Sequence, residues 1–116
     1  MKKILCILLS AVLLLSMVAC DSSEYQDAVS AMAWGEYQTA HEIFLTVPGY
    51  EDADTLASEC VYRMAMEAFH AEDYETASAY FLEISEYKDA EEKARECSLT
   101  LGYQEAYALK EEIVQA

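Results

Sequence analysis

A stretch of 37 residues that begins at Tyr25 is repeated, without a gap, from Tyr62. The two copies are identical at 14 of their 37 positions, and most of the shared residues are small or aromatic: Tyr25/Tyr62, Ala28/Ala65, Ala31/Ala68, Tyr37/Tyr74, Thr39/Thr76, Ala40/Ala77, Phe44/Phe81, Leu45/Leu82, Tyr50/Tyr87, Asp52/Asp89, Ala53/Ala90, Ala57/Ala94, Glu59/Glu96 and Cys60/Cys97. Self-similarity at such a period is typical of stacked supersecondary units. The chain is therefore predicted to be a small repeat protein.

Each copy carries the sequence pattern of helices, and no segment shows the alternation of a strand. Ser23 with Gln26 and Asp89 with Glu92 fit the capping box that starts a helix, and Asp52 is a further candidate cap. Five helices in antiparallel hairpins are expected, from Ser23 to about Gly35, Tyr37 to Pro48, Asp52 through Ala68, Tyr74 to Ile84, and Asp89 on to Val114. Gly102 falls inside the last of them, where we expect a close helix contact rather than a break.

The first 19 residues have the three parts of a secretory signal, namely Lys2 and Lys3, an apolar run from 4 to 18, and the small Ala19. The run is shorter than the about 20 residues that span a membrane. Met17-Val18-Ala19-Cys20 resembles the bacterial lipobox, in which a diacylglyceryl group is attached to the cysteine and the chain is cut before it.

We therefore expect a lipoprotein signal peptide at 1–19, a lipidated Cys20 with a short tether to residue 22, and a helical domain at 23–116. The resemblance implies a protein held by its lipid on the outer, extracytoplasmic face of a bacterial cell membrane. The alternative is an ordinary signal peptide followed by an incidental cysteine.

The charge of the chain is strongly negative, with 22 acidic against seven basic residues and a net charge of −15. The phosphates of nucleic acid would be repelled by such a surface, so nucleic acid is not an expected partner. The acidity favours cationic partners, or it serves solubility alone.

The turn Gly35-Glu36-Tyr37 followed by Ala40 and Phe44, and its copy at residues 72–81, resemble the tetratricopeptide repeat. That family implies a short right-handed solenoid of antiparallel helix hairpins, here two repeats and a C-terminal capping helix with a polar outer face. The present unit is longer than the usual length of about 34 residues. Glu72 replaces the turn glycine, and a Tyr-x-Asp-Ala junction replaces the familiar proline.

In this family the first helix of each repeat lines a concave peptide-binding groove. The corresponding residues here are Tyr25, Val29, Met32, Tyr62, Met66, Phe69, Leu99 and Tyr103. Tyrosine and methionine suit binding surfaces, and no Lys or Arg is among the eight. A basic or amphipathic helical ligand is therefore favoured over an acidic peptide. The alternative is that part of this set belongs to the core.

The preferred function is thus a membrane-anchored adaptor or scaffold that binds an envelope protein or peptide. Two alternatives stay open: a surface lipoprotein that binds a solute or glycan through its tyrosines, and a structural lipoprotein that assembles with itself. No spacing typical of a nucleophile, a phosphate loop or a catalytic pair is present, so we expect no enzyme and no cofactor.

Cys60 and Cys97 occupy equivalent places in successive units. Such residues lie about one helix spacing apart, roughly 8–10 Å, whereas bridged Cα atoms lie within about 7 Å. Buried free thiols are therefore expected rather than a disulfide. His41 and His70 have no ligand pattern around them, and no metal site is expected.

Overall fold

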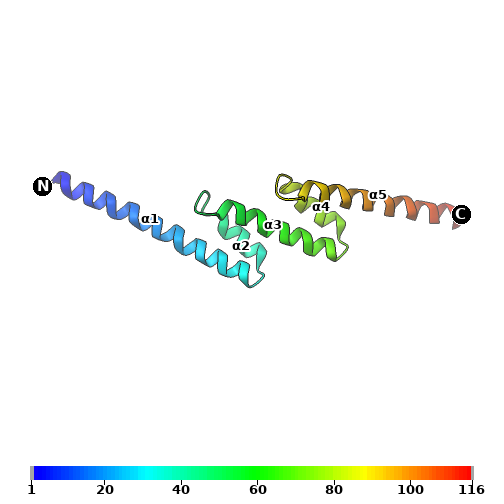
Figure 1. Cartoon of the computed structure of the whole chain (residues 1–116), viewed down its shortest axis with the longest axis horizontal. Helices are drawn as coiled ribbons and strands as arrows, with labels where there is room; N and C mark the ends of the chain where they lie inside the picture. The colour runs from blue at the N-terminus through cyan, green and yellow to red at the C-terminus, as the bar shows by residue number, and fades with distance from the viewer. Residues whose placement is uncertain (1, 116) are drawn as a thin grey trace. The chain divides into compact units, whose positions relative to one another are not determined.

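The computed structural model is all-α, as predicted (Figure 1). It describes residues 2–115, and of residues 11–19, 114 and 115 the backbone alone. Within this range five helices are present and no strand: α1 (Lys2–Ala33), α2 (Tyr37–Phe44), α3 (Ala53–His70), α4 (Tyr74–Glu83) and α5 (Ala90–Gln115). The chain divides into two compact units, Met1–Ala57 and Ser58–Ala116, and the boundary falls inside α3.

In the first unit, α2 folds back along the C-terminal part of α1 (Figure 1). Gly35 makes the turn with a φ of +79°, a backbone conformation that favours glycine. The interface buries Ala28 and Ala40 together with the ring of Phe44, all of which are fully inaccessible to solvent. Small alanine side chains let the helix axes approach closely, and the phenylalanine supplies the apolar area that holds the helices together.

In the second unit, α3, α4 and α5 share one core cluster, formed by Ala65, Ala77, Phe81, Ala90, Ala94 and Cys97. Its partly buried rim carries the larger side chains of α3 and α4. The start of α4 is fixed by Asp73, whose side chain accepts a hydrogen bond from the Thr76 amide at 3.2 Å. An aspartate in this place satisfies one of the amides that a helix N-terminus leaves unpaired.

The sequence repeat is also a repeat of backbone geometry. Gly35 and Glu72, 37 residues apart, both have a positive φ, and so do Glu51 and Lys88. Seven backbone hydrogen bonds of the first copy recur 37 residues later, donated by Trp34/Ala71, Gly35/Glu72, Glu36/Asp73, Ala40/Ala77, Tyr50/Tyr87, Ala53/Ala90 and Leu56/Lys93. The same side chains are therefore brought to the same places in both copies.

Three details differ from expectation. The helix predicted to begin at Ser23 is the end of the longer α1, so Ser23 lies inside a helix and is not a cap, because a cap residue must leave the helical conformation. Helix α2 ends at Phe44 rather than near Pro48, since the amides of Thr46 and Val47 bond three residues back, to Ile43 and Phe44. Gly102 does lie within a continuous helix, but the expected close contact is wrong, because an added Cβ would have no neighbour within 4 Å.

Candidate functional site

Three of the eight predicted groove residues lie in the first unit. Tyr25, Val29 and Met32 are half-buried on α1. The ring of Tyr25 packs edge-on against Phe44 of α2, with 5.9 Å between ring centroids, and against Tyr50 at 5.4 Å. Tyr25 therefore contributes to the packing of α1 on α2 and the following turn.

Tyr62, Met66 and Phe69 hold the equivalent places in the second unit. All three pack against its core cluster. The Tyr62 and Phe81 ring centroids are 5.8 Å apart, and those of Phe69 and Tyr74 are 5.6 Å apart. The side chains that the sequence assigns to a groove on α3 thus cover the interface between α3 and α4.

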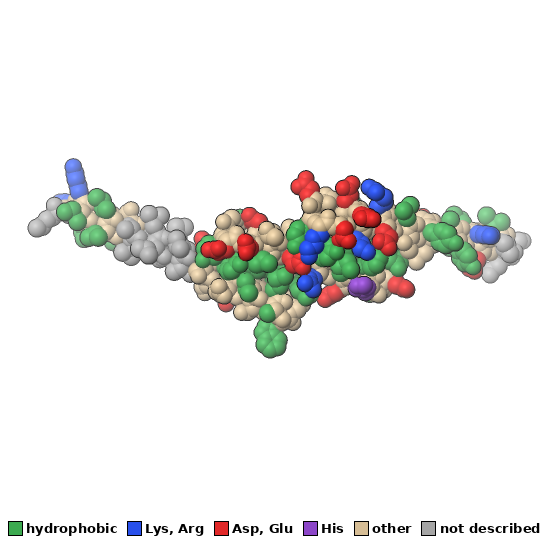
Figure 2. Space-filling model, in the orientation of Figure 1, with side chains coloured by type: hydrophobic (Ala, Val, Ile, Leu, Met, Phe, Trp, Pro, Cys, Tyr) green, Lys and Arg blue, Asp and Glu red, His purple; other side chains and the backbone are tan. Residues whose placement is uncertain are grey.

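The last two predicted residues, Leu99 and Tyr103, are in a different situation on α5. Their side chains are 69% and 74% exposed. Further large apolar side chains, Tyr107, Leu109 and Ile113, are exposed beyond them, and Figure 2 shows apolar side chains on this part of α5. The expectation that the last helix closes the array with a polar outer face is therefore wrong for its C-terminal half.

A polar network that the sequence analysis did not identify surrounds Glu59 of α3. Glu59 is 8% exposed, and within the described part of the chain it is the one charged residue that is buried. Its carboxylate accepts hydrogen bonds from Arg63 Nε at 2.9 Å, from Lys88 Nζ at 2.8 Å and from the Tyr87 hydroxyl. Three donors, two of them charged, compensate the loss of water around the carboxylate.

The protonation of Glu59 follows from this environment. Burial raises its pKa, but the hydrogen bonds from Lys88, Tyr87 and Arg63 and the charge of Lys88 outweigh burial and bring the pKa from 4.5 to about 2. The same contact with Glu59 raises the pKa of Lys88. A carboxylate this strongly held in its ionised form is a poor proton acceptor, and its hydrogen bonds join α3 to the turn before α5.

Cations lie on the aromatic rings of the second unit. Lys88 Nζ is 4.8 Å from the centroid of Tyr62 and 5.3 Å from that of Tyr87. Lys93 Nζ is 4.7 Å from the centroid of Phe69. The Tyr62 hydroxyl donates to Asp89 at 2.7 Å, a contact that raises the pKa of the tyrosine. Two of the predicted groove residues therefore already hold a cation of the same chain on one ring face.

The network belongs to the second unit alone among the described repeats. Counting back 37 residues from Glu59, Arg63 and Lys88 leads to Ser22, Gln26 and Glu51, none of which can make the same charge pairs. The Glu59–Arg63 contact has the four-residue spacing of neighbours on a helix and was readable in the sequence. Lys88 joins them from 29 residues away, and no local pattern indicates that.

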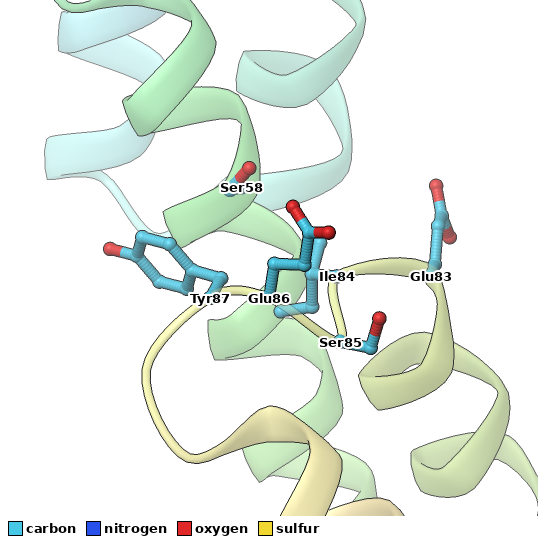
Figure 3. A pocket seen from close by; sticks show the side chains of 6 residues that line it. All are labelled: Ser58, Glu83, Ile84, Ser85, Glu86 and Tyr87. Atoms are coloured by element: carbon cyan, nitrogen blue, oxygen red, sulfur yellow. The ribbon is translucent and has the colours of Figure 1, made fainter.

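Beside this network lies an open hollow of about 350 Å³ between α3 and the turn that joins α4 to α5. Figure 3 shows its lining, with Ser58 on α3 and most of the other side chains on the turn: Ser58, Glu83, Ile84, Ser85, Glu86 and Tyr87. Two carboxylates and hydroxyl groups face it, but no nucleophile with a lowered pKa is among them. The hollow can accept hydrogen-bond donors.

The two cysteines of the repeat are buried in the structure and have free thiols. Burial raises the pKa of Cys60 to about 11, helped by the neighbouring Glu59, and it raises the pKa of Cys97 as well. A thiol is a weak nucleophile and metal ligand when it stays protonated. Neither cysteine is suited to reaction in the folded state.

The histidines are placed apart from any ligand set. His41 Nδ1 lies 3.1 Å from the carbonyl oxygen of Ala57, and His70 is exposed with its ring beside that of Phe69. Within residues 2–115 no three His, Cys, Asp or Glu side chains come together as metal ligands would.

The lipidation candidate Cys20 is exposed on α1. The side chains of Met17, Val18 and Ala19, which complete the lipobox resemblance, lie outside the described residues. In the part of the chain whose structure is described, no helix has the length and apolar character needed to cross a membrane.

The chain matches no protein-family model, no curated protein and no solved structure.

Proposed function

We propose that this chain is a lipid-anchored, helical-repeat adaptor that binds a protein or peptide at the outer face of a bacterial membrane. Its fold would be a short solenoid related to the tetratricopeptide repeats. The repeated backbone hydrogen bonds and the recurring Ala/Phe pairs between helices support this description. Cys20, exposed and preceded by the lipobox-like residues, would carry the anchor.

The observation that carries the adaptor proposal is the exposed apolar surface of α5. Leu99, Tyr103 and Ile113 are each about two-thirds or more accessible, on a helix whose other residues include many charges. Apolar side chains that share one exposed face mark sites where another macromolecule binds. The binding surface therefore differs from the one predicted by sequence, since it uses Leu99 and Tyr103 rather than the half-buried side chains of α1 and α3.

Binding of a glycan by the repeat tyrosines is less well supported. Tyr25, Tyr50, Tyr62 and Tyr87 contact other rings edge to face, and Lys88 lies over two of them. A sugar stacks on a free ring face, and these rings are engaged in packing or with a cation.

The adaptor proposal is tested by photo-crosslinking in living cells. A photoreactive residue replaces Tyr103, and in a matched control it replaces Gln104, which is exposed about 100° around the same helix. A discrete protein adduct at 103 and none at 104 is the expected result. Absence of an adduct at either position, with the protein present at normal abundance, would refute the adaptor function.

The anchor is tested separately with a fatty acid that carries a clickable alkyne. The wild-type protein should become labelled and fractionate with membranes. A Cys20→Ser variant should lose the label, whereas a Cys6→Ser variant should keep it. Label that persists in Cys20→Ser would show that the anchor is not at this residue.

A further inference from the structure

The exposed face of α5 has a defined place in the repeat. Leu99, Gly102 and Tyr103 stand 37 residues after Tyr62, Ala65 and Met66, which in turn stand 37 residues after Tyr25, Ala28 and Val29. In the first two units Tyr25 packs against Phe44 of α2, and Tyr62, Ala65 and Met66 pack in the core that α3 shares with α4. The face of α5 is thus the third copy of an interface that the chain forms twice.

No second helix covers this third copy within the described residues. The turns that start α2 and α4 lie at Gly35 and Glu72, both with positive φ. The equivalent residue in the third copy is Leu109, which is inside α5. Its neighbours Ala108 and Lys110 also favour a helix, so α5 continues where the first two units turn back.

Equivalent residues of the three copies differ in burial, because no second helix covers α5 in the described part of the chain. Ala28 and Ala65 are fully buried, whereas a Cβ added at Gly102 would meet nothing within 4 Å apart from the backbone of its own helix. Met66 is packed against a core, and its equivalent Tyr103 is 74% exposed. Gly102 leaves room for a close helix approach, with Leu99 and Tyr103 on either side of it.

The face extends beyond the repeat register. Gly102, Ala106, Leu109 and Ile113 follow the three- and four-residue spacing of one helix side, with Lys110 beside them. From Leu99 to Ile113 this side is about 20 Å long, enough for a helix of two to three turns, the size of α2 and α4. Glu105, Glu111 and Glu112 are exposed around it and give its surroundings a negative charge.

We infer that α5 binds a short amphipathic helix of another protein, which takes the place that α2 and α4 take in the first two units. That helix would present a small residue followed four positions later by an aromatic residue, as in Ala40/Phe44 and Ala77/Phe81. Its flanks would be basic, complementary to the glutamates of α5. Lys110 offers a cation to the incoming aromatic ring, as Lys88 and Lys93 do to rings within the chain.

This inference rests on the proposed adaptor function and names the chemistry of its partner. The probe is a synthetic peptide with the sequence of residues 73–84, which form α4 with its Asp73 cap, carrying lysine in place of the exposed Glu75 and Glu83. A second peptide keeps the two glutamates, and a third has Glu in place of its Ala77. Binding of each labelled peptide to the purified protein is followed by fluorescence anisotropy.

The lysine peptide should bind at least about five times more tightly than the glutamate peptide at low salt, and added salt should narrow this ratio. The peptide with Glu for Ala77 should not bind. In the protein, Tyr103→Asp should weaken binding about tenfold or more. Gln104→Asp adds the same charge about 100° around the helix and should change binding less than about twofold. Circular dichroism of both variants shows whether α5 remains folded.

Lack of binding by the lysine peptide at about millimolar concentration, or equal binding by Tyr103→Asp, would overturn the inference. So would sedimentation that shows a dimer of the wild-type protein and a monomer of Tyr103→Asp, because a second copy would then occupy the face. If cells give a crosslinked partner at position 103 and the peptides do not bind, the helix inference fails and the adaptor function stands. If the peptides bind and cells give no crosslinked partner, the adaptor function fails and the helix inference stands.

Discussion

Replacement of Glu59 by glutamine should destabilise the protein, and the loss should depend on pH. Glu59 is a buried carboxylate held by Arg63, Lys88 and Tyr87. The matched control is Glu96→Gln, the same change 37 residues later. Glu96 is half exposed, and its contact with Lys93 is long, at 3.5 Å.

The size of the effect follows from proton linkage. A fall in the pKa of Glu59 from 4.5 to about 2 corresponds to about 3 kcal/mol, at about 1.4 kcal/mol for each tenfold change in proton affinity. Because Arg63 and Lys88 are 55% and 49% exposed, water and salt screen their charges. We therefore expect Glu59→Gln to cost about 2 kcal/mol at pH 6, and Glu96→Gln to cost less than about 0.5 kcal/mol.

The sign with pH is fixed by the direction of the pKa change. Since the pKa of Glu59 is lower in the folded protein, its stabilisation is present above pH 4.5 and is lost as the pH falls through 4.5 toward about 2. The difference in free energy of unfolding between wild type and Glu59→Gln should therefore shrink by about half between pH 6 and pH 3.

Urea unfolding followed by circular dichroism at 222 nm, at both pH values and low salt, measures this difference. Comparison with the variant removes the titration of the other carboxyl groups, which the two proteins share. Equal losses for Glu59→Gln and Glu96→Gln, or a difference that does not change with pH, would show that the network does not hold a charged Glu59 in the folded state.

Three other predictions concern the core, the glycines and the thiols. Phe81→Ala should lower the free energy of unfolding by about 3–4 kcal/mol because the ring is fully buried, whereas Leu82→Ala, 60% exposed, should change it by less than about 0.5 kcal/mol; similar losses in urea unfolding would contradict the core assignment. Gly102→Ala should raise the free energy of unfolding by about 0.5–1 kcal/mol, and with it the melting temperature, because the site is helical and open. Gly35→Ala should lower the melting temperature because Gly35 has a positive φ. Melting temperatures that shift in the same direction in both variants would refute this prediction. Iodoacetamide at pH 8 should modify Cys60 and Cys97 only after unfolding in urea, as judged by peptide mass mapping, and rapid labelling of the folded protein would contradict their burial and raised pKa.

The sequence was sufficient to predict the helical fold, because every unit repeats the same local signals. Aspartates or glycines mark the turns, and alanines and phenylalanines recur at helical spacing between them. The backbone hydrogen bonds follow the same 37-residue register. Helix boundaries were less well predicted where an α-helix is followed by a turn with hydrogen bonds between residues three apart, as after Phe44.

The predicted site residues were less informative, because the same helical face serves packing and binding. Tyr62, Met66 and Phe69 have the residue types of a binding surface, yet they cover an interface inside their unit. The Glu59 network depends on Lys88, which reaches α3 from the turn before α5. Contacts over 29 residues have no periodic signal in one sequence, so local reasoning missed them.

The third copy of the repeat differs from the first two in the exposure of equivalent side chains. The place of a residue in the repeat does not alone tell whether its side chain is packed or exposed, since Met66 and Tyr103 hold equivalent places and differ in exposure. The difference arises at the next turn, where Gly35 and Glu72 reverse the chain and Leu109 does not. Because α5 continues past that point, an apolar face shaped for a second helix stays open, and the repeat itself supplies the description of the helix that fits it.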